Sequence, residues 1–442
     1  MARDCGTSAR SVSLSELFVL VQTSIGVMLS KTKNNIPVAR PNPPHLSEHA
    51  RELKDLEDSG IFSNFGPINQ RFEQELTETV FGAGQCLTVC NATIGLMVAM
   101  RQVIGEDRPS QKRYALMPSF TFAAVAHAAM WNGLTPLFCD IDRQTWLPSA
   151  DHEEELLQRY QGEIAVVVPY ATFGNNLDLG RYDELSDRYG VPVVVDAAAS
   201  LGALDADGRG FGSGFRWPVV FSMHATKTFA TGEGGVVYCA DVDRVKTIRA
   251  MCSFGFEAPR VATLPGLNGK LNEVGALTAL LQLKRFEAVV EHRRRLSEAY
   301  RRYLPDWTHQ ETCGKRQSYA FQSVLLKESL TPMRARIVEI LRDCGIGAST
   351  YFSPHLAEQP YFAKHSVSSS IAITQEISER ILTLPMYDTM TDSEVHDVAS
   401  GLMDAISQLV GESNSSNSIK VTAIDRKNDP AYVGTIFASD KS

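Results

Sequence analysis

Short, uniformly apolar runs alternate with amphipathic stretches through much of the first half of the chain. Six apolar runs predict strands, at residues 114–118, 135–141, 164–170, 191–197, 219–223 and 234–239. They are rich in valine and lack polar alternation, as expected for strands buried on both faces. Helices are predicted between them, for example over 151–161 and 179–189. This alternation predicts an α/β fold with a mostly parallel sheet between helices.

A leading arm precedes the predicted sheet. It starts near residue 36 and leads into a helix with an apolar face. Three side chains at helical spacing make that face: Phe72, Leu76 and Val80. Residues 1–35 form an extension of unknown role that contains an apolar stretch at 17–29. That stretch is shorter than the roughly 20 apolar residues of a membrane span, so we expect no membrane association.

A smaller α+β domain is predicted over residues 271–411. It opens with a long helix after Leu271, whose polar face carries the basic stretch 291–296, and its last helix follows Asp392. Residues 412–442 begin with ESNSSNS and show little apolar periodicity, which predicts a flexible tail. The large domain, with its leading arm, is thus expected to cover residues 36–270.

Composition excludes some functions. The 442-residue chain carries a formal net charge of −8. This disfavours nucleic acid as a partner, because binding to its phosphates needs a basic surface. The eight cysteines are scattered and form no CxxC pair. We therefore expect a cytoplasmic protein with reduced thiols and without a metal site.

Four polar or aromatic clusters stand where predicted strands end, and ligands of open α/β sheets bind at such ends. In the first, which lies in the block NATIGL (91–96), Ala92 and Thr93 stand at the start of an apolar helix. Free N–H groups and a hydroxyl there can hold an anion, although a plain helix cap is the alternative. In the second, Phe122 follows a strand. It can cover a planar ring or simply pack in the core.

The other two clusters contain opposite charges. Asp196 ends the apolar strand at 191–197, so its carboxylate needs a positive partner unless it caps a helix. Another strand ends near Ser222, and Lys227 follows in a polar loop closed by GEGG. Taken alone, a loop lysine is usually a solvated surface group.

The order of these four clusters changes the interpretation of the lysine. Pyridoxal 5′-phosphate (PLP) needs donors for its phosphate and a face on which its ring stacks. It also needs a carboxylate for its pyridine nitrogen and an amine for its aldehyde. The chain offers these groups in the order that a PLP enzyme with this sheet requires, which makes Lys227 the candidate for the amine.

The chain resembles the DegT-type family of nucleotide-sugar aminotransferases, which are PLP-dependent enzymes of the aspartate-aminotransferase fold (fold type I). Eight blocks between about residues 36 and 410 carry the resemblance: SNFGPINQRFE, NATIGL, PSFTFAAVAHAAMWNGLTPLFCDID, VVVDAAASLGA, FSMHATKTFATGEGG, GLNGKLNE, TYFSPHL and LTLPMYDTMTDSE. The resemblance implies a large domain with a mostly parallel seven-stranded sheet between helices and a smaller C-terminal α+β domain.

The resemblance also implies a role for each candidate residue. Lys227 would hold PLP as a Schiff base and then move the proton between cofactor and substrate. Asp196 would pair with the pyridinium nitrogen, and Phe122 would stack on the ring. The phosphate would be surrounded by four residues, the last of them from the neighbouring subunit of a homodimer: Ala92, Thr93, Ser222 and Asn268.

Two positions depart from the family pattern. Ala199 stands where the family usually has Gln, or His in a dehydratase branch, near the phenolic oxygen of the cofactor. Lys270 stands in place of the usual Arg and is expected to contact the substrate, with contacts altered by this change. The dehydratase branch also replaces the Schiff-base lysine by His, so the presence of Lys227 favours transamination. Tyr351 and His355 are expected either in the substrate pocket or in packing roles.

By resemblance, the reaction moves an amino group from L-glutamate to a nucleotide-linked keto sugar, with a dTDP-4-keto-6-deoxyhexose as first choice. The product would be an amino sugar for a surface polysaccharide or a glycosylated natural product. A 3-keto sugar and a UDP or GDP carrier stay open. So do another PLP reaction on this fold, such as a dehydratase, racemase or aldolase, and a regulatory homologue without catalysis. A dinucleotide site at GRGFGSG (208–214) is disfavoured, because no strand precedes it and no helix follows.

Overall fold

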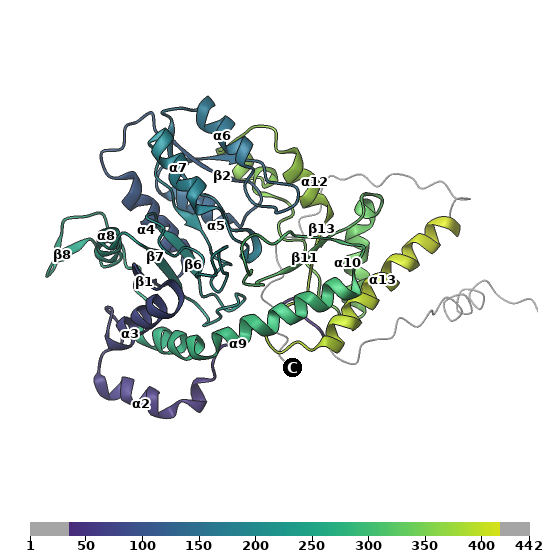
Figure 1. The fold of residues 1–442 in the computed structure, drawn as a ribbon, viewed down its shortest axis with the longest axis horizontal. Helices are drawn as coiled ribbons and strands as arrows, with labels where there is room; N and C mark the ends of the chain where they lie inside the picture. Colours follow the sequence, from purple (N-terminus) through teal and green to yellow (C-terminus); the bar gives the residue numbers. More distant parts are fainter. Residues whose placement is uncertain (1–34, 416–442) are drawn as a thin grey trace, which may run out of the picture.

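The computed structural model describes residues 35–415 (Figure 1). The apolar stretch at 17–29 and residues 416–442 lie outside the described residues. Within the described part, no helix combines the length and apolar character needed to cross a membrane. The cysteines described there are free thiols, and no cluster of His, Cys, Asp or Glu in residues 35–415 is suited to a metal ion.

One sheet organises the large domain. Its strands, in order across the sheet, are β1 (Gln85–Val89), β7 (Gly235–Cys239), β6 (Val219–Ser222), β5 (Val195–Asp196), β4 (Ile164–Val167), β2 (Tyr114–Pro118), β3 (Thr135–Cys139) and β12 (Val367–Ser368). Isolated parallel bridges from Val167 to Val193 and from Tyr170 to Asp196 join β4 to β5. Only β7 runs against its neighbours among these strands. This is the predicted, mostly parallel α/β sheet, with β12 added at one edge by the C-terminal part of the chain.

Helices cover both faces of this sheet (Figure 1). One face packs against α4 (Ala92–Ile104), α5 (Ala123–Trp131) and α8 (Val242–Cys252). The other packs against α3 (Pro67–Leu76), α6 (Ala150–Arg159), α7 (Leu179–Tyr189) and the first half of α9 (Glu273–Tyr303). Phe72 and Leu76 are fully buried, as predicted, while Val80 lies in the short helical segment η2 (Thr77–Phe81) that continues α3. Both faces of the sheet are therefore closed to solvent, and ligands must approach at the strand ends.

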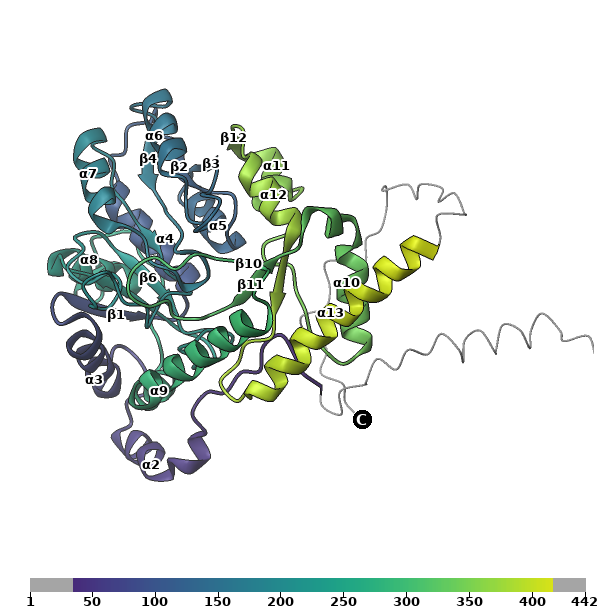
Figure 2. The same ribbon diagram turned by 45° about the vertical axis from the view of Figure 1, so that its right-hand side comes forward.

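The smaller domain is built on an antiparallel sheet of β10 (Thr308–His309), β11 (Gln322–Leu325) and β13 (Ile381–Leu384). Figure 2 shows this sheet with α9, α10 (Arg334–Asp343) and α13 (Asp392–Ser415) beside it and α12 (Ala372–Arg380) toward the large domain. Further elements are α2 (Ala50–Ser59), α11 (Phe362–His365), the hairpin of β8 (Phe256–Ala258) and β9 (Val261–Ala262), and several short 3-10 turns. Because α13 continues to Ser415, residues 412–415 are helical and do not belong to the predicted flexible tail.

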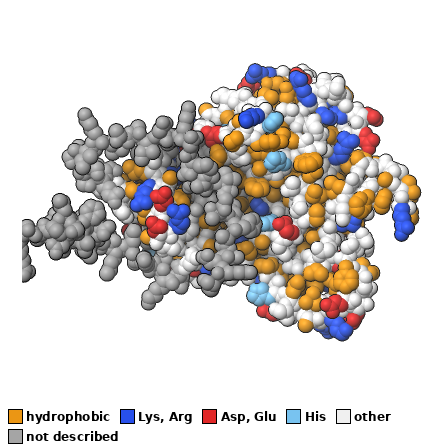
Figure 3. Space-filling view, turned by 180° about the vertical axis from the view of Figure 1, so that it is seen from behind, with side chains coloured by type: hydrophobic (Ala, Val, Ile, Leu, Met, Phe, Trp, Pro, Cys, Tyr) orange, Lys and Arg blue, Asp and Glu red, His pale blue; other side chains and the backbone are white. Residues whose placement is uncertain are grey.

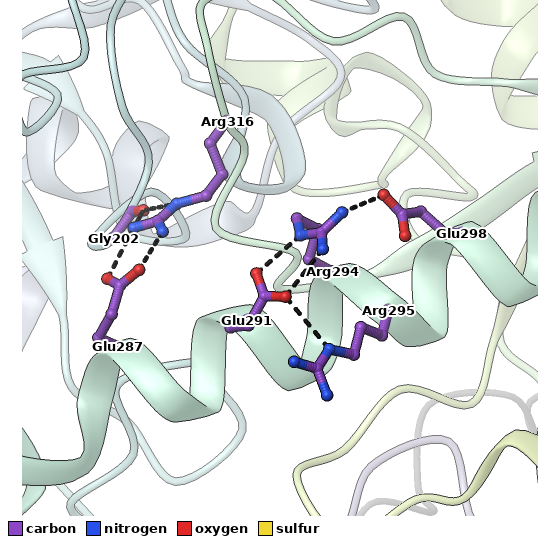
Figure 4. Close-up of polar contacts among 7 residues, drawn as sticks. All are labelled: Gly202, Glu287, Glu291, Arg294, Arg295, Glu298 and Arg316. Atoms are coloured by element: carbon purple, nitrogen blue, oxygen red, sulfur yellow. Dashed lines mark hydrogen bonds and ion pairs between the residues drawn. The ribbon is translucent and has the colours of Figure 1, made fainter.

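The basic stretch at 291–296 is split between two faces of α9. Arg294 and Arg295 pair with Glu291 on the solvent side, as predicted for a polar face (Figure 4). Arg293 is only 4% exposed and forms an ion pair with Asp388 of the small domain. Neighbouring residues of a helix point about 100° apart, so a run of three arginines cannot share one face. The prediction of a polar face was wrong for Arg293.

Candidate active site

The carboxyl ends of the parallel strands meet along one edge of the large sheet, and the four predicted clusters lie at that edge. Asn91 follows β1, Phe122 follows β2, Asp196 ends β5, and the loop with Lys227 follows β6. The antiparallel β7 presents its first residue, Gly235, at the same edge. Residues distant in the sequence are thereby brought into one site.

The start of α4 provides a place for an anion. The side chain of Asn91 caps this helix and accepts a hydrogen bond from the backbone N–H of Ile94 (2.9 Å). The first N–H groups of a helix have no partner within the helix, which leaves those of Ala92 and Thr93 to an outside acceptor. The positive end of the helix dipole adds to the attraction for a phosphate.

Gly235 brings the end of β6 close to the start of α4. It pairs with Ser222 across β6 and β7. A Cβ atom on Gly235 would lie 2.8 Å from the backbone nitrogen of Ala92 and 3.0 Å from the carbonyl oxygen of Phe221. Only glycine permits this approach without displacing backbone atoms. Paired residues of antiparallel strands point to the same face, so Ser222 faces the start of α4 as Gly235 does; its hydroxyl accepts a hydrogen bond from the backbone N–H of His224 (3.2 Å), which leaves its own proton for an outside acceptor.

Asp196 is a buried carboxylate, 3% exposed. Its Oδ1 accepts a hydrogen bond from the backbone N–H of Ala198 (3.0 Å). Burial raises the pKa of Asp196 to about 6, against the lowering effects of that hydrogen bond and of the charge on Lys227. The hydroxyl of Tyr170, on the neighbouring strand, has a raised pKa because it is buried close to this carboxylate. An ionised Asp196 therefore calls for a further cation, and a pyridinium nitrogen is one.

Lys227 lies in the loop between β6 and β7 and points toward the small domain. Its Nζ is 5.2 Å from the centre of the Phe321 ring. Burial lowers the pKa of Lys227, and the charge of Asp196 acts in the opposite direction. The next residue, Thr228, fixes the loop by donating a hydrogen bond to the carbonyl oxygen of Ser318 (3.0 Å). The loop that carries the amine is thus anchored, and the lowered pKa favours the neutral amine that a nucleophile or base requires.

Phe122 has an uncovered ring. Its side chain is 63% exposed although it directly precedes α5 at the edge that carries Asp196 and Lys227. An exposed aromatic ring at a strand end offers the stacking face for a planar heterocycle. The alternative that Phe122 packs in the core is wrong.

The residues present fit PLP on each of its groups. The start of α4 and Ser222 would hold the phosphate, Phe122 would lie on the ring, Asp196 would meet the pyridine nitrogen and Lys227 would bond to the aldehyde carbon. Fold and site together define a PLP-dependent enzyme of fold type I.

Residues 45–403 match the DegT/DnrJ/EryC1/StrS aminotransferase family, and the chain belongs to that family. Protein Rv3402c of Mycobacterium tuberculosis is 32% identical over 375 residues, which cover 84% of this chain and 90% of the relative. The dTDP-4-amino-4,6-dideoxy-D-glucose transaminase of Escherichia coli is 26% identical over 369 residues, 81% of this chain and 96% of the relative. The crystal structure of DesI with its TDP-sugar product is 29% identical, with a TM-score of 0.77 over 88% of this chain and 96% of DesI. The protein is thus a PLP-dependent sugar aminotransferase.

Two predicted residues lie in the stretch between β9 and α9. Asn268 is exposed and forms an isolated bridge with Ser253, at the end of α8. Lys270 has its Nζ 4.6 Å from the centre of the Phe254 ring, which is 47% exposed. Neither side chain is in recorded contact with Lys227 or Asp196 of the same chain.

Tyr351 and His355 belong to a loop from the small domain. Tyr351 packs edge-on against Phe321, with ring centres 5.5 Å apart. Phe321 in turn contacts Lys227, so Tyr351 is linked to the amine through that ring. His355 is 1% exposed, and its two ring nitrogens are 2.8 Å from Ser119 Oγ and from Gln375 Oε1. With both nitrogens occupied, the geometry favours a structural role for His355 over contact with a substrate.

Sequence reasoning missed three residues around the site. Tyr170 ends the run 164–170 and carries the same signal, an aromatic at a strand end, that identified Phe122. Ser318 donates a hydrogen bond to the carbonyl oxygen of Ala199, in the segment that also carries Phe321. No local pattern marks Ser318 or Phe321, because the fold alone brings them to Lys227.

Proposed function

We propose that this enzyme transfers the amino group of L-glutamate to a dTDP-linked 4-keto-6-deoxyhexose. The observation that carries the proposal is the placement of the amine of Lys227 and the carboxylate of Asp196 at one sheet edge, beside an anion site. The name of the Escherichia coli relative supports a dTDP carrier and an amino group on carbon 4 of the sugar. The product would be an amino sugar for a surface polysaccharide or a glycosylated natural product.

Lys227 and Asp196 divide the chemistry between them. PLP, when bound, supplies the electron sink that lets the donor carbon lose a proton. Asp196 keeps the pyridine nitrogen protonated and so maintains that sink. Lys227, while not bonded to the cofactor, would accept the proton of the donor carbon at its Nζ and return it to the adjoining carbon of the cofactor. Burial lowers the pKa of Lys227, and this shift favours the neutral form that a base requires.

The surroundings fix the orientation of the cofactor. The N–H groups of Ala92 and Thr93 and the hydroxyl of Ser222 anchor one end, and Phe122 supports one face of the ring. With its phosphate end and one ring face held, the cofactor would keep its reacting carbon within reach of the Lys227 loop. This positioning lowers the entropic part of the barrier.

We also propose a homodimer with shared active sites. Asn268 is exposed and touches no phosphate donor of its own chain, as expected if it serves the neighbouring subunit. Large apolar side chains are exposed on the β8–β9 hairpin and after α2: Phe254, Phe256, Val261, Ile61 and Phe62. Figure 3 shows hydrophobic side chains on the projecting hairpin and on the lowest part of the molecule. Burial of these apolar surfaces between two subunits would stabilise a dimer.

A cytoplasmic location is also part of the proposal, because nucleotide-linked sugars are the proposed substrates.

A single-turnover experiment tests this function. Purified enzyme loaded with PLP is mixed with L-glutamate, and the absorbance of the cofactor is followed as it converts to its amine form. Keto sugars linked to dTDP, UDP or GDP are then added to the converted enzyme, and the amino sugar is identified by mass spectrometry. We expect conversion by glutamate and reversal by the dTDP-4-keto-6-deoxyhexose. Reversal by a 3-keto sugar, or by a UDP or GDP sugar alone, would contradict the proposed substrate. An unchanged spectrum with glutamate would contradict the donor.

A further inference from the structure

The segment 316–321 leads from the large domain into β11 of the small domain, and its last side chain lies beside the amine of Lys227. Its last residue, Phe321, precedes β11, and the centre of its ring is 5.2 Å from Lys227 Nζ. The same ring packs against Phe173 at 5.3 Å and Tyr351 at 5.5 Å between ring centres. Among the described residues, Phe321 thus supplies the aromatic ring that contacts the amine of Lys227.

The large domain fixes this segment through backbone and hydroxyl groups. The backbone N–H of Ser318 donates to the carbonyl oxygen of Gly174 (3.0 Å), and the hydroxyl of Ser318 donates to that of Ala199. Thr228, next to Lys227, donates to the carbonyl oxygen of Ser318 (3.0 Å). The loop that carries the amine and the segment that carries the ring are therefore tied together.

Two arginines fix the segment from the side of α9. Arg316 donates to the carbonyl oxygen of Gly202 and pairs with Glu287 of that helix (Figure 4). Arg293 donates to the carbonyl oxygen of Tyr319 at 3.3 Å, where the backbone has a positive φ of 55°. Tyr319 is not glycine, and such a backbone conformation persists only when the surroundings hold it.

We propose that Phe321 is a positioning residue for Lys227, whose ring face holds the charged amine near Asp196 and keeps water away from it. A cation is attracted to the negative face of an aromatic ring, more strongly where water is excluded. The proposal rests on the proposed function in one respect, since it takes Lys227 as the reacting amine.

The charges around the amine agree with this role. Within the described residues, Asp196 of β5 is the charged group whose field acts on Lys227. Burial lowers the pKa of Lys227 and the carboxylate raises it. The ring of Phe321 adds a second attraction for the protonated form without adding a charge. Loss of the ring face, with the apolar cover retained, should therefore lower the pKa of Lys227 further.

The test measures the pKa of Lys227 directly, in the full-length enzyme without PLP. The amine is labelled with acetic anhydride over a range of pH, and the extent of labelling of the Lys227 peptide is read by mass spectrometry. We expect Phe321→Leu to lower the pKa by about half a unit, the size of a modest cation–π attraction. Phe321→Tyr keeps the ring and should leave the pKa of Lys227 unchanged. Phe321→Met, which also lacks an aromatic face, replaces the leucine variant if that variant does not fold.

Phe352→Leu is the matched control. Phe352 belongs to the same aromatic cluster, with its ring 5.5 Å from that of Phe173, but it has no recorded contact with Lys227. An unchanged pKa in Phe321→Leu, or an equal shift in Phe352→Leu, would overturn the proposal. The measurement uses neither cofactor nor substrate, so its result is independent of whether glutamate or the dTDP sugar is the true substrate.

Discussion

Asp196 and Lys227 each shift the pKa of the other toward its charged form, yet burial outweighs both effects. The pKa of Asp196 is raised to about 6, and that of Lys227 is lowered. The site thus holds a carboxylate and an amine whose mutual attraction does not offset the cost of burying their charges. PLP would offer each group a partner, since its pyridinium nitrogen would pair with the carboxylate of Asp196 and its aldehyde carbon would bond to the amine of Lys227.

The buried carboxylate gives the protein without cofactor a definite pH dependence. The pKa of Asp196 in the folded state, about 6, exceeds the usual value of about 3.9 in an unfolded chain. The folded state therefore binds the extra proton between these values. Its contribution to stability is present below about pH 4 and is lost as the pH rises through 6.

Asp196→Asn should remove this dependence. We expect the variant without PLP to be more stable than the wild type at pH 8, by roughly 1–3 kcal/mol, and about equally stable at pH 4. Urea denaturation of both proteins at the two pH values measures the difference. A variant that is less stable at pH 8, with an unchanged slope against pH, would contradict the assignment.

The anion site depends on the close approach at Gly235. Gly235→Ala should weaken PLP binding at least about tenfold and destabilise the fold by about 1–3 kcal/mol, because the added Cβ meets backbone atoms of Asn91, Ala92 and Phe221. Titration with PLP followed by absorbance measures the affinity. Gly411→Ala in α13 is the control, since no described residue lies within 4 Å of a Cβ there; it should leave PLP binding unchanged and make the fold as stable or slightly more stable. Equal effects of the two substitutions on PLP affinity would contradict the proposed anion site at the start of α4.

The Arg293–Asp388 pair should matter for stability. Both side chains are 5% exposed, and Arg293 Nη2 lies 2.8 Å from Asp388 Oδ1. Asp388→Asn leaves a buried arginine without its counterion and should cost about 3–5 kcal/mol of unfolding free energy. Asp58→Asn, in a pair with Lys54 that is 71% and 63% exposed, should cost less than about 1 kcal/mol. Chemical denaturation compares them, and similar losses in the two variants would show that the buried pair is not needed.

Much of the fold could be predicted from the sequence because strands buried on both faces need unbroken apolar runs. The runs at 114–118 and 219–223 coincide closely with β2 and β6. β1 was not predicted, since Gln85 and Thr88 interrupt its apolar character. Thr88 is nevertheless fully buried, because its hydroxyl donates to Asn69 and Glu73. Such a compensated polar residue cannot be recognised from a local pattern.

The site divides in the same way. Asp196 and Lys227 stand at strand ends, and their order along the chain sufficed to place them in one site. Phe321 owes its position to a contact between the domains, and Arg293 owes its position to Asp388, which lies far along the chain; no sequence spacing encodes either contact. Arg293 lies in a run whose sequence indicates a solvated basic face. The orientation of α9 about its own axis nevertheless places this side chain in the interior.

The most direct test of the account is to locate the lysine that carries PLP. Enzyme loaded with PLP is reduced with borohydride and digested, and the modified peptide is identified by mass spectrometry. The account predicts the modification on Lys227, and its disappearance when L-glutamate is added before reduction. Modification of another lysine, such as Lys270, or a label on Lys227 that persists after glutamate, would contradict amino transfer at this site.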